Sequence, residues 1–285
     1  MPSTHPVLVL HGGAGWRPLR GQKLEQVTKS LNLILDSVYP KLAKGMSALE
    51  AAALAASLLE NDPLYNAGKG SKIQRDGKIR MSASIMDGQR RRFGGCVNVE
   101  GVKNPIMLAK SLLKRKDRTL CTVGAREFAK EKLLAFASPY TEKEKNLWKK
   151  QVEGKSGTIG AVALDRKGRL AAATSTGGRG FEYPYRVSDS ATCAGNYASP
   201  LCAVSCTGVG EEIVEFAGAA TVCAYVEAGI ELDVAAEKLL GKARKAKAKF
   251  GLIAVDRNGR IVTDTTTQSL VWAAATNQGY AFTKA

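Results

Sequence analysis

The sequence is poor in histidine, and its cysteines lack the spacing from which zinc sites are built. Only His5 and His11 occur in 285 residues, and none of the six cysteines forms a Cys-x-x-Cys pair. A protein zinc site needs about four such ligands, usually at close spacing. The sequence therefore argues against a zinc enzyme, and buried reduced thiols are the expected state of the cysteines.

Long apolar runs are also missing. Residues 51–59 form one of the longest, and they are far too short to span a bilayer. The first ten residues carry no basic segment ahead of an apolar one, so we expect a strand there and a cytoplasmic protein. No GxGxxG, Walker or Gly-x-Ser-x-Gly motif occurs. The glycine-rich residues 11–15 are accordingly expected to be a structural turn.

Positive charge is abundant. Lysine and arginine number 42 against 26 acidic residues, a formal net charge of +16. The basic residues cluster at 110–118, 143–155 and 242–249. Three explanations are open, namely nucleic-acid binding, an acidic small substrate, or a solvated basic surface. No aromatic-rich nucleic-acid motif accompanies the clusters, which argues against a nucleic-acid partner.

The length allows one large domain or two small ones, and the pattern along the chain favours an α+β protein. Helical spacing marks residues 22–42, 47–60, 104–113, 122–134, 211–228 and 232–250. Strand pairs joined by polar, glycine-bearing turns are expected around residues 75–79, 158–176 and 254–261. The lysine-rich residues 139–157 are expected to be an exposed linker. Blocks of helices alternating with blocks of strands predict sheets covered by helices on their outer faces.

Thr158 opens a strand directly after this expected linker and follows Gly157. A threonine hydroxyl is a weak nucleophile unless a base lies beside it, and a chain that begins with threonine supplies its own amine as that base. An α-amine has a pKa of about 7.7–8.0, which suits catalysis near neutral pH. A glycine before the threonine leaves room for the hydroxyl to attack the preceding carbonyl. We therefore interpret Gly157–Thr158 as a candidate self-cleavage site.

The hairpin that follows brings a second hydroxyl to the first. If its turn spans residues 165–168 or 165–169, Thr158 lies opposite Ser175 or Thr176. Directly opposed residues on neighbouring strands are close enough for hydroxyl groups to hydrogen-bond. Threonine also favours strands for packing reasons alone, so this pairing does not by itself establish a catalytic role.

Two further clusters could serve the same chemistry. Thr207 and Gly208 lie between an apolar strand and a helix, where a hydroxyl and a backbone N–H could stabilise an oxyanion. Arg186 and Asp189 could hold the carboxylate and the ammonium of an amino acid. Taken alone, a strand-to-helix turn and a surface ion pair explain these clusters equally well.

Taken together, these motifs resemble the plant-type L-asparaginase and isoaspartyl peptidase family of N-terminal nucleophile hydrolases. The resemblance runs in family order from residue 7 to about residue 216. The matching segments are residues 11–15, 65–70, 85–88, 157–165, 173–178, 186–189 and 206–211.

The resemblance implies a four-layer αββα sandwich and cleavage into residues 1–157 and 158–285, assembled as an (αβ)₂ dimer of cleaved protomers. It implies hydrolysis of L-asparagine or β-aspartyl dipeptides, with no required cofactor. A structural sodium on backbone oxygens between Leu59 and Gly68 is a further implication. The residue roles implied are Thr158 as nucleophile, Thr176 as the second threonine, Thr207 and Gly208 as oxyanion donors, Asn66 as a positioning residue, and Arg186, Asp189, Gly208 and Gly210 as substrate-binding residues.

Several departures from the family pattern lie where they could reshape the pocket. Ser82 stands where the family often has an acidic residue, and Tyr185 and Ser188 stand where it often has glycine. These changes leave the leaving-group preference open. The alternatives are another β-aspartyl amide such as a glycosylated asparagine, a protein bond after aspartate, or a basic nucleic-acid-binding protein on a catalytically idle fold.

Overall fold

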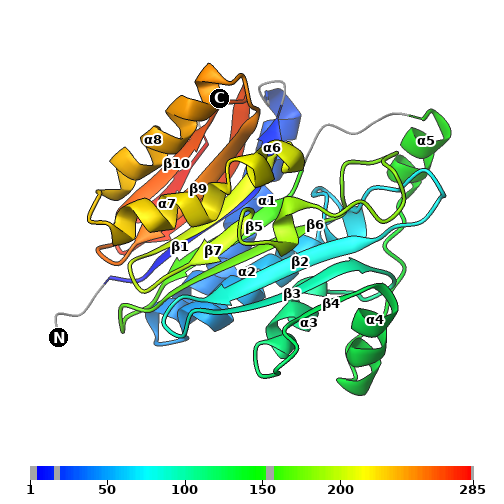
Figure 1. Cartoon of the computed structure of the whole chain (residues 1–285), viewed down its shortest axis with the longest axis horizontal. Coiled ribbons are helices and arrows are strands. Elements are labelled where there is room, and N and C mark those ends of the chain that lie inside the picture. Colours follow the sequence, from blue (N-terminus) through cyan, green and yellow to red (C-terminus); the bar gives the residue numbers. More distant parts are fainter. Residues whose placement is uncertain (1–4, 16–19, 152–156, 284–285) are drawn as a thin grey trace.

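The computed structural model describes residues 5–15, 20–151 and 157–283. The chain is a mixed α+β protein built on two β-sheets (Figure 1). The larger sheet has the strand order β12-β11-β1-β5-β6-β2-β3-β4, and the smaller has the order β10-β9-β8-β7. The strands of the larger sheet are β1 (Val7–Gly15), β2 (Met81–Asp87), β3 (Arg92–Val99), β4 (Thr119–Cys121), β5 (Ile159–Leu164), β6 (Leu170–Thr176), β11 (Ser269–Thr276) and β12 (Gly279–Phe282). Those of the smaller are β7 (Asn196–Ala198), β8 (Cys202–Gly208), β9 (Phe250–Asp256) and β10 (Ile261–Thr265).

Alternation along the strands divides the core into layers, because successive side chains of a strand point to opposite faces. Leu8 and Leu10 of β1 belong to a cluster with the helices on one face of the larger sheet. Val7 and Val9 belong to a second cluster, which they share with strands β8 and β9 of the smaller sheet. The two sheets therefore pack face to face through a common apolar layer.

The helices lie outside the two sheets. Helices α1 (Gly21–Ala43), α2 (Ala48–Asn61) and α3 (Pro105–Leu112) pack on the larger sheet, and α7 (Gly218–Glu227) and α8 (Leu232–Lys245) pack on the smaller one. The remaining helices are α4 (Thr122–Glu131), α5 (Glu142–Lys149) and α6 (Gly210–Glu215). The expected capping box is present, since the Ser47 hydroxyl accepts a hydrogen bond from the Glu50 N–H at 3.2 Å. No helix among the described residues is long and apolar enough to cross a membrane.

The hairpin of β5 and β6 has the register that the sequence predicts. Ile159 pairs with Ser175 and Leu164 with Leu170, which places Thr158 opposite Thr176. The turn is held by Asp165, whose carboxylate accepts hydrogen bonds from the backbone of Lys167 at 2.9 Å and of Arg169 at 3.1 Å. The other carboxylate oxygen accepts from the Ala48 N–H at 3.0 Å. Asp165 thus ties the hairpin to the start of α2.

Three expectations about the first half of the chain are wrong. The glycine-rich residues 11–15 belong to β1 itself, where a bulge between His11 and Gly13 absorbs the extra residue. Residues 75–79 form a turn that leads into β2, but no strand precedes it, and the Arg75 N–H donates to the Glu182 carbonyl at 3.0 Å. The expected linker at residues 139–157 contains α5, although residues 152–156 lie outside the described part.

The second half differs at two helices. The expected helix over residues 211–228 is broken at Ala217, which has a left-handed φ of 46°. After the break, the Ala219 N–H at the start of α7 donates to the Ala194 carbonyl, in the segment that leads into β7, at 2.7 Å. The expected helix over residues 232–250 ends at Lys245, since Phe250 begins β9. Packing against the smaller sheet overrides the continuous helical pattern in both places.

Leu35 tests how far the packing of α1 stabilises the fold. Replacing this fully buried side chain with alanine should lower the free energy of unfolding by about 2–5 kcal/mol, because the cavity cannot close completely. Leu33 on the same helix is 58% exposed, so Leu33→Ala is the matched control and should change stability little. Urea unfolding followed by circular dichroism measures both. Equal losses in the two variants would show that burial of Leu35 does not set its contribution to stability, since helix propensity favours alanine at both positions.

Candidate active site

Thr158 lies at the start of β5, where it meets Thr176 across the hairpin. The Thr158 hydroxyl donates to the Thr176 hydroxyl oxygen at 3.3 Å, and that oxygen also accepts from the Gly178 N–H at 3.1 Å. Both threonines are buried. Ser175, the other candidate from the turn length, points to the opposite face and donates to a Glu60 carboxylate oxygen at 2.7 Å. The hairpin therefore pairs Thr158 with Thr176 and not with Ser175.

The peptide before Thr158 is closely surrounded. A Cβ on Gly157 would lie 3.0 Å from the Asn66 Cβ, and a Cβ on Gly13 would lie 2.9 Å from the Gly157 Cα. Asn66 makes no hydrogen bond to Thr158 in the described structure. Its amide nitrogen donates to the Gly178 carbonyl at 2.5 Å, on the same loop that donates to Thr176. Asn66 thus packs against Gly157 and connects it to the loop at Gly178 that also contacts Thr176.

Thr207 and Gly208 approach this bond from the smaller sheet. The buried Thr207 hydroxyl oxygen accepts a hydrogen bond from the Ala14 N–H at 3.1 Å, and Ala14 follows the glycine that touches Gly157. Gly208 has a φ of 150°, and a Cβ there would lie 2.4 Å from the Phe250 Cα. Only glycine fits at this position without moving β9. The end of β8 can therefore present a hydroxyl and a backbone N–H beside Thr158.

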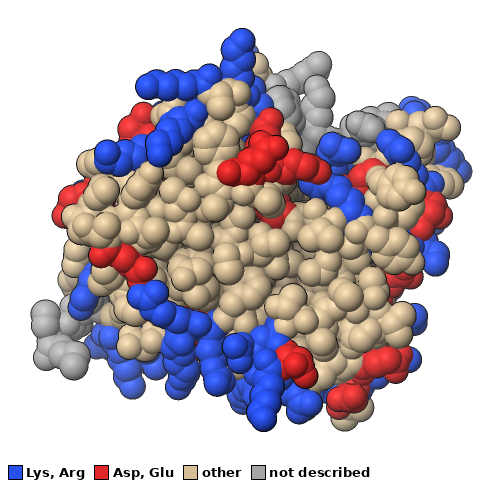
Figure 2. Space-filling model, in the orientation of Figure 1, with Lys and Arg blue, Asp and Glu red and all other residues tan. Residues whose placement is uncertain are grey.

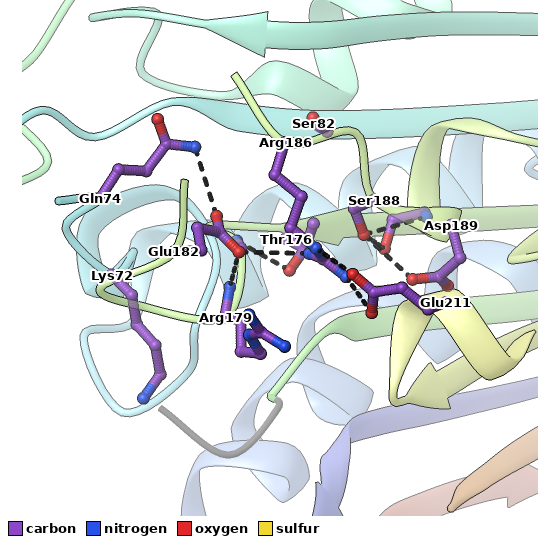
Figure 3. A network of polar contacts seen from close by, with 12 residues as sticks. Lys72, Gln74, Ser82, Thr176, Arg179, Glu182, Arg186, Ser188, Asp189 and Glu211 are labelled. Carbon is purple, nitrogen blue, oxygen red and sulfur yellow. Dashed lines mark hydrogen bonds and ion pairs between the residues drawn. The ribbon is translucent and has the colours of Figure 1, made fainter. Parts of the chain in front are cut away.

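Arg186 is held on two sides by carboxylates (Figure 3). Its Nε and Nη2 donate to the two Glu211 oxygens at 2.7 and 2.8 Å, and its Nη1 donates to Glu182 at 3.2 Å. This bidentate pairing lowers the pKa of Glu211 to about 2. Glu211 is half-exposed whereas Glu182 is buried. Glu211 thus pairs with the face of the Arg186 guanidinium that we expect to bind a substrate carboxylate. Because Glu211 is half-exposed, an incoming carboxylate can displace it into solvent.

Asp189 is a buried carboxylate with spare bonding capacity. Its Oδ1 accepts from the Ser188 hydroxyl at 3.0 Å, while its Oδ2 has no hydrogen-bond partner among the described residues. Burial raises the pKa of Asp189 to about 6, against the opposing effect of the Ser188 hydrogen bond. A Cβ on Gly210 would lie 2.7 Å from both Asp189 Oδ1 and Arg186 Nη2. Gly210 therefore leaves open the space between an anion and a cation.

His11 belongs to the scaffold behind the nucleophile. Its Nε2 lies 2.9 Å from the Ser205 hydroxyl, which in turn lies 2.7 Å from the Thr174 hydroxyl. Complete burial lowers the pKa of His11 to about 3, so the ring is neutral at pH 7. A Cβ on Gly160 would lie 2.0 Å from the Ser205 oxygen. This neutral chain of hydrogen bonds joins β1 and β6 to β8, and the absence of a side chain at Gly160 of β5 leaves room for it.

Sequence reasoning missed the partners of Arg186. Glu182 also accepts a hydrogen bond from Gln74 at 3.3 Å and from the Arg179 N–H at 2.8 Å (Figure 3). The four-residue spacing of Glu182 and Arg186 is the only sequence signal, and in a loop that spacing implies no contact. Glu211 was assigned to the first turn of a helix, where an acidic residue needs no further explanation.

Comparison with known proteins agrees with this arrangement. A family model described as Asparaginase matches residues 4–284. The chain belongs to the asparaginase family. It is 42% identical over 275 residues to the isoaspartyl peptidase/L-asparaginase of Synechocystis sp., covering 90% of this chain and 83% of that protein. The human protein of the same name is 37% identical, covering 95% and 93%, and the plant-type L-asparaginase of Pyrococcus abyssi is 33% identical, covering 89% and 91%.

Within this asparaginase-family chain, the departures from the family pattern lie close to the site. Ser82 pairs with Thr176 between β2 and β6. Tyr185 adopts a left-handed φ of 66°, a conformation that favours glycine, and its ring lies 3.9 Å from the Arg80 guanidinium. The Asn98 amide donates to the Tyr185 carbonyl at 2.9 Å. These contacts hold a non-glycine residue in the strained backbone next to Arg186.

Thr176 is tested by removing its hydroxyl without changing its shape. Thr176→Val deletes the acceptor for both Thr158 and Gly178, so we expect the rate of amide hydrolysis to fall by about 10²-fold. Thr176→Ser keeps the hydroxyl and serves as the control, with a loss below about tenfold. Steady-state release of ammonia from L-asparagine measures both variants. A valine variant as fast as the serine variant would remove this hydroxyl from the mechanism.

Asp189 predicts a pH dependence of substrate affinity. Its pKa of about 6 lies above the ordinary range, so the carboxylate needed to pair with an ammonium is lost as pH falls through about 6. Below that pH the KM for L-asparagine should rise by about tenfold per pH unit, because only the ionised fraction of Asp189 binds the ammonium. Asp189→Asn should raise KM at every pH and remove this rise. A KM that stays constant down to about pH 4.5 would contradict the assignment.

Proposed function

We propose that the chain is a self-processing amidohydrolase that hydrolyses L-asparagine and β-aspartyl dipeptides with Thr158 as its nucleophile. The contact between the Thr158 and Thr176 hydroxyls is the observation that carries the proposal. The relatives named isoaspartyl peptidase/L-asparaginase, which align with nearly the whole chain, support the substrate class. Arg186 and Asp189 support it further, because they offer a cation and an anion to the two charged groups of an amino acid.

Self-cleavage comes first in the proposed sequence. The Thr158 hydroxyl attacks the Gly157 carbonyl carbon, and the peptide C–N bond breaks to give an ester between Gly157 and the threonine oxygen. Water hydrolyses this ester, which leaves residues 1–157 with a carboxylate and Thr158 with a free amine. The contact of Gly13 and Asn66 with Gly157 supports this step, because it confines the peptide beside the hydroxyl.

Hydrolysis then proceeds through an acyl-enzyme. The free amine of Thr158 takes the proton of its own hydroxyl, whose oxygen attacks the β-carbonyl carbon of the substrate. Thr207 and the Gly208 N–H stabilise the tetrahedral oxyanion. The amine returns the proton to the leaving nitrogen as the C–N bond breaks. Water activated by the same amine hydrolyses the resulting ester, which releases aspartate and restores Thr158.

The finer architecture is part of the proposal. We infer the αββα sandwich of N-terminal nucleophile hydrolases, which the packing of helices outside two facing sheets supports. Residues 1–285 then form one domain, cut into two pieces that assemble as an (αβ)₂ dimer. A cytoplasmic location stays a prediction. Glycosylated asparagine and a protein bond after aspartate remain the alternative substrates for the same nucleophile.

A structural sodium ion is a further part of the proposal, at the loop that follows α2. The Glu60 carbonyl oxygen lies 2.1 Å from the position that a Cβ on Gly68 would take. The carbonyl oxygens of Tyr65 and Pro63 lie 2.0 and 2.9 Å from the corresponding position on Gly70. Backbone carbonyl oxygens thus lie close to both glycines of this loop, and carbonyl oxygens are ligands suited to a hard cation. When bound, the ion would hold the backbone that leads to Asn66.

Thr158→Ala tests the proposed function directly. The purified wild-type protein should resolve by intact mass into residues 1–157 and 158–285, whereas the variant should stay a single chain of about 30.3 kDa without hydrolase activity. Thr158→Ser retains a hydroxyl and should keep both reactions at a reduced rate. A panel of L-asparagine, a β-aspartyl dipeptide and a glycosylated asparagine then fixes the leaving group. An uncut variant with full activity would exclude Thr158 as the nucleophile.

A further inference from the structure

A basic groove lies away from the proposed active site, between the start of α2, the end of α3 and the β2–β3 turn. Its volume is about 620 Å³. Two acidic side chains, Glu50 and Asp87, line it together with six basic ones, which gives the lining a formal charge of +4. The six basic residues are Arg90, Arg92, Lys110, Lys114, Arg115 and Lys132. Figure 2 shows lysine and arginine crowding the lower edge of the molecule, below β2, β3 and α3 of Figure 1.

Two of the six cations are neutralised within the groove. Arg90 pairs with Asp87 at 3.0 Å, and Lys110 pairs with Glu50. For the other four, no carboxylate of residues 5–15, 20–151 or 157–283 lies within ion-pair distance. Four positive side chains therefore face one groove without a counter-charge from the described part of the chain.

Three of these four cations are nevertheless held in place. The Arg92 Nη1 donates to the Leu113 carbonyl at 3.2 Å. The Arg115 guanidinium and the Lys132 ammonium both lie over the ring of Phe128, at 5.7 and 5.5 Å from its centroid. One aromatic ring thus keeps two like charges close together. Their mutual repulsion opposes folding, and a bound anion would relieve it.

We propose that this groove binds a small ligand that carries several phosphate groups. Arginine offers a planar fork that matches phosphate oxygens, and lysine adds mobile point charges beside it. The volume lies in the usual range for a small-molecule site. None of the described residues that line the groove is aromatic, so they offer no platform on which the bases of a single-stranded nucleic acid could stack. The chemistry therefore favours a compact polyphosphate over a polymer.

This site is separate from the proposed catalytic residues. The lining residues include none of Thr158, Thr176, Arg186 and Asp189. Asp87 ends strand β2, whose other end carries Ser82 beside Thr176. Binding in the groove can thus be measured in a protein whose hydrolase activity is intact, and it can fail without affecting the proposed function.

Inorganic triphosphate is the first probe, titrated into the purified full-length protein by isothermal calorimetry. We expect one triphosphate per chain, with an affinity that falls between about 50 mM and about 200 mM salt. The double variant Lys114→Glu/Arg115→Glu should weaken binding by at least about tenfold, because it replaces two charged donors with anions. Both side chains are exposed, so the fold and asparagine hydrolysis should be unchanged.

The matched control is Lys238→Glu/Lys245→Glu on α8, which alters the net charge equally at exposed positions outside the groove. It should leave triphosphate affinity within about twofold. Adenosine triphosphate is the second probe: equal affinity identifies free polyphosphate as the ligand class, and tighter binding identifies a nucleotide. Equal losses in both double variants, no saturable binding, or a preference for oligonucleotides that grows with their length would overturn the proposal.

Discussion

The register of the β5–β6 hairpin is the constraint on which the site depends. Asp165 sets it, because one carboxylate fixes the turn and also binds the first N–H group of α2. A slip of one residue would turn Thr158 or Thr176 to the opposite face, since side chains alternate along a strand. The hydroxyl pair is thus positioned by a buried carboxylate at the far end of the same hairpin.

The rest of the site is assembled by the contact between the two sheets. Thr207 comes from the smaller sheet and reaches Ala14 in the larger one, while the loop that carries Arg186 and Asp189 lies beside the end of β8. The threonines and Asp189 are buried in this contact, whereas the loop around Arg186 is partly exposed. Glu211 contacts Arg186 from a half-exposed position, so this carboxylate can move aside on the substrate-binding side of the site.

The sequence predicts an interaction well where regular secondary structure fixes which residues meet. The pairing of Thr158 with Thr176 depends on a two-residue period and a short turn, both of which are local. The ion pair of Arg186 with Glu182 forms within an irregular loop, and its pair with Glu211 joins that loop to the start of α6, so neither pair leaves a periodic signal in the sequence. The break at Ala217 has the same origin, since nothing in an alanine-rich helical pattern announces a left-handed residue. The sequence therefore predicts the contact that a regular hairpin fixes, and it does not predict the contacts that irregular loops make.

The strand order has a consequence for a protein cut before Thr158. Strand β1 lies between β11 and β5, and β5 and β6 lie between β1 and β2, so strands from the two pieces alternate within one sheet. Neither piece can leave without breaking hydrogen bonds on both of its sides. Unfolding of the cut protein then becomes a dissociation, whose midpoint rises with protein concentration, whereas the uncut chain unfolds as a single molecule. Cleavage would thus change the molecularity of folding while leaving every backbone contact of the sheet in place.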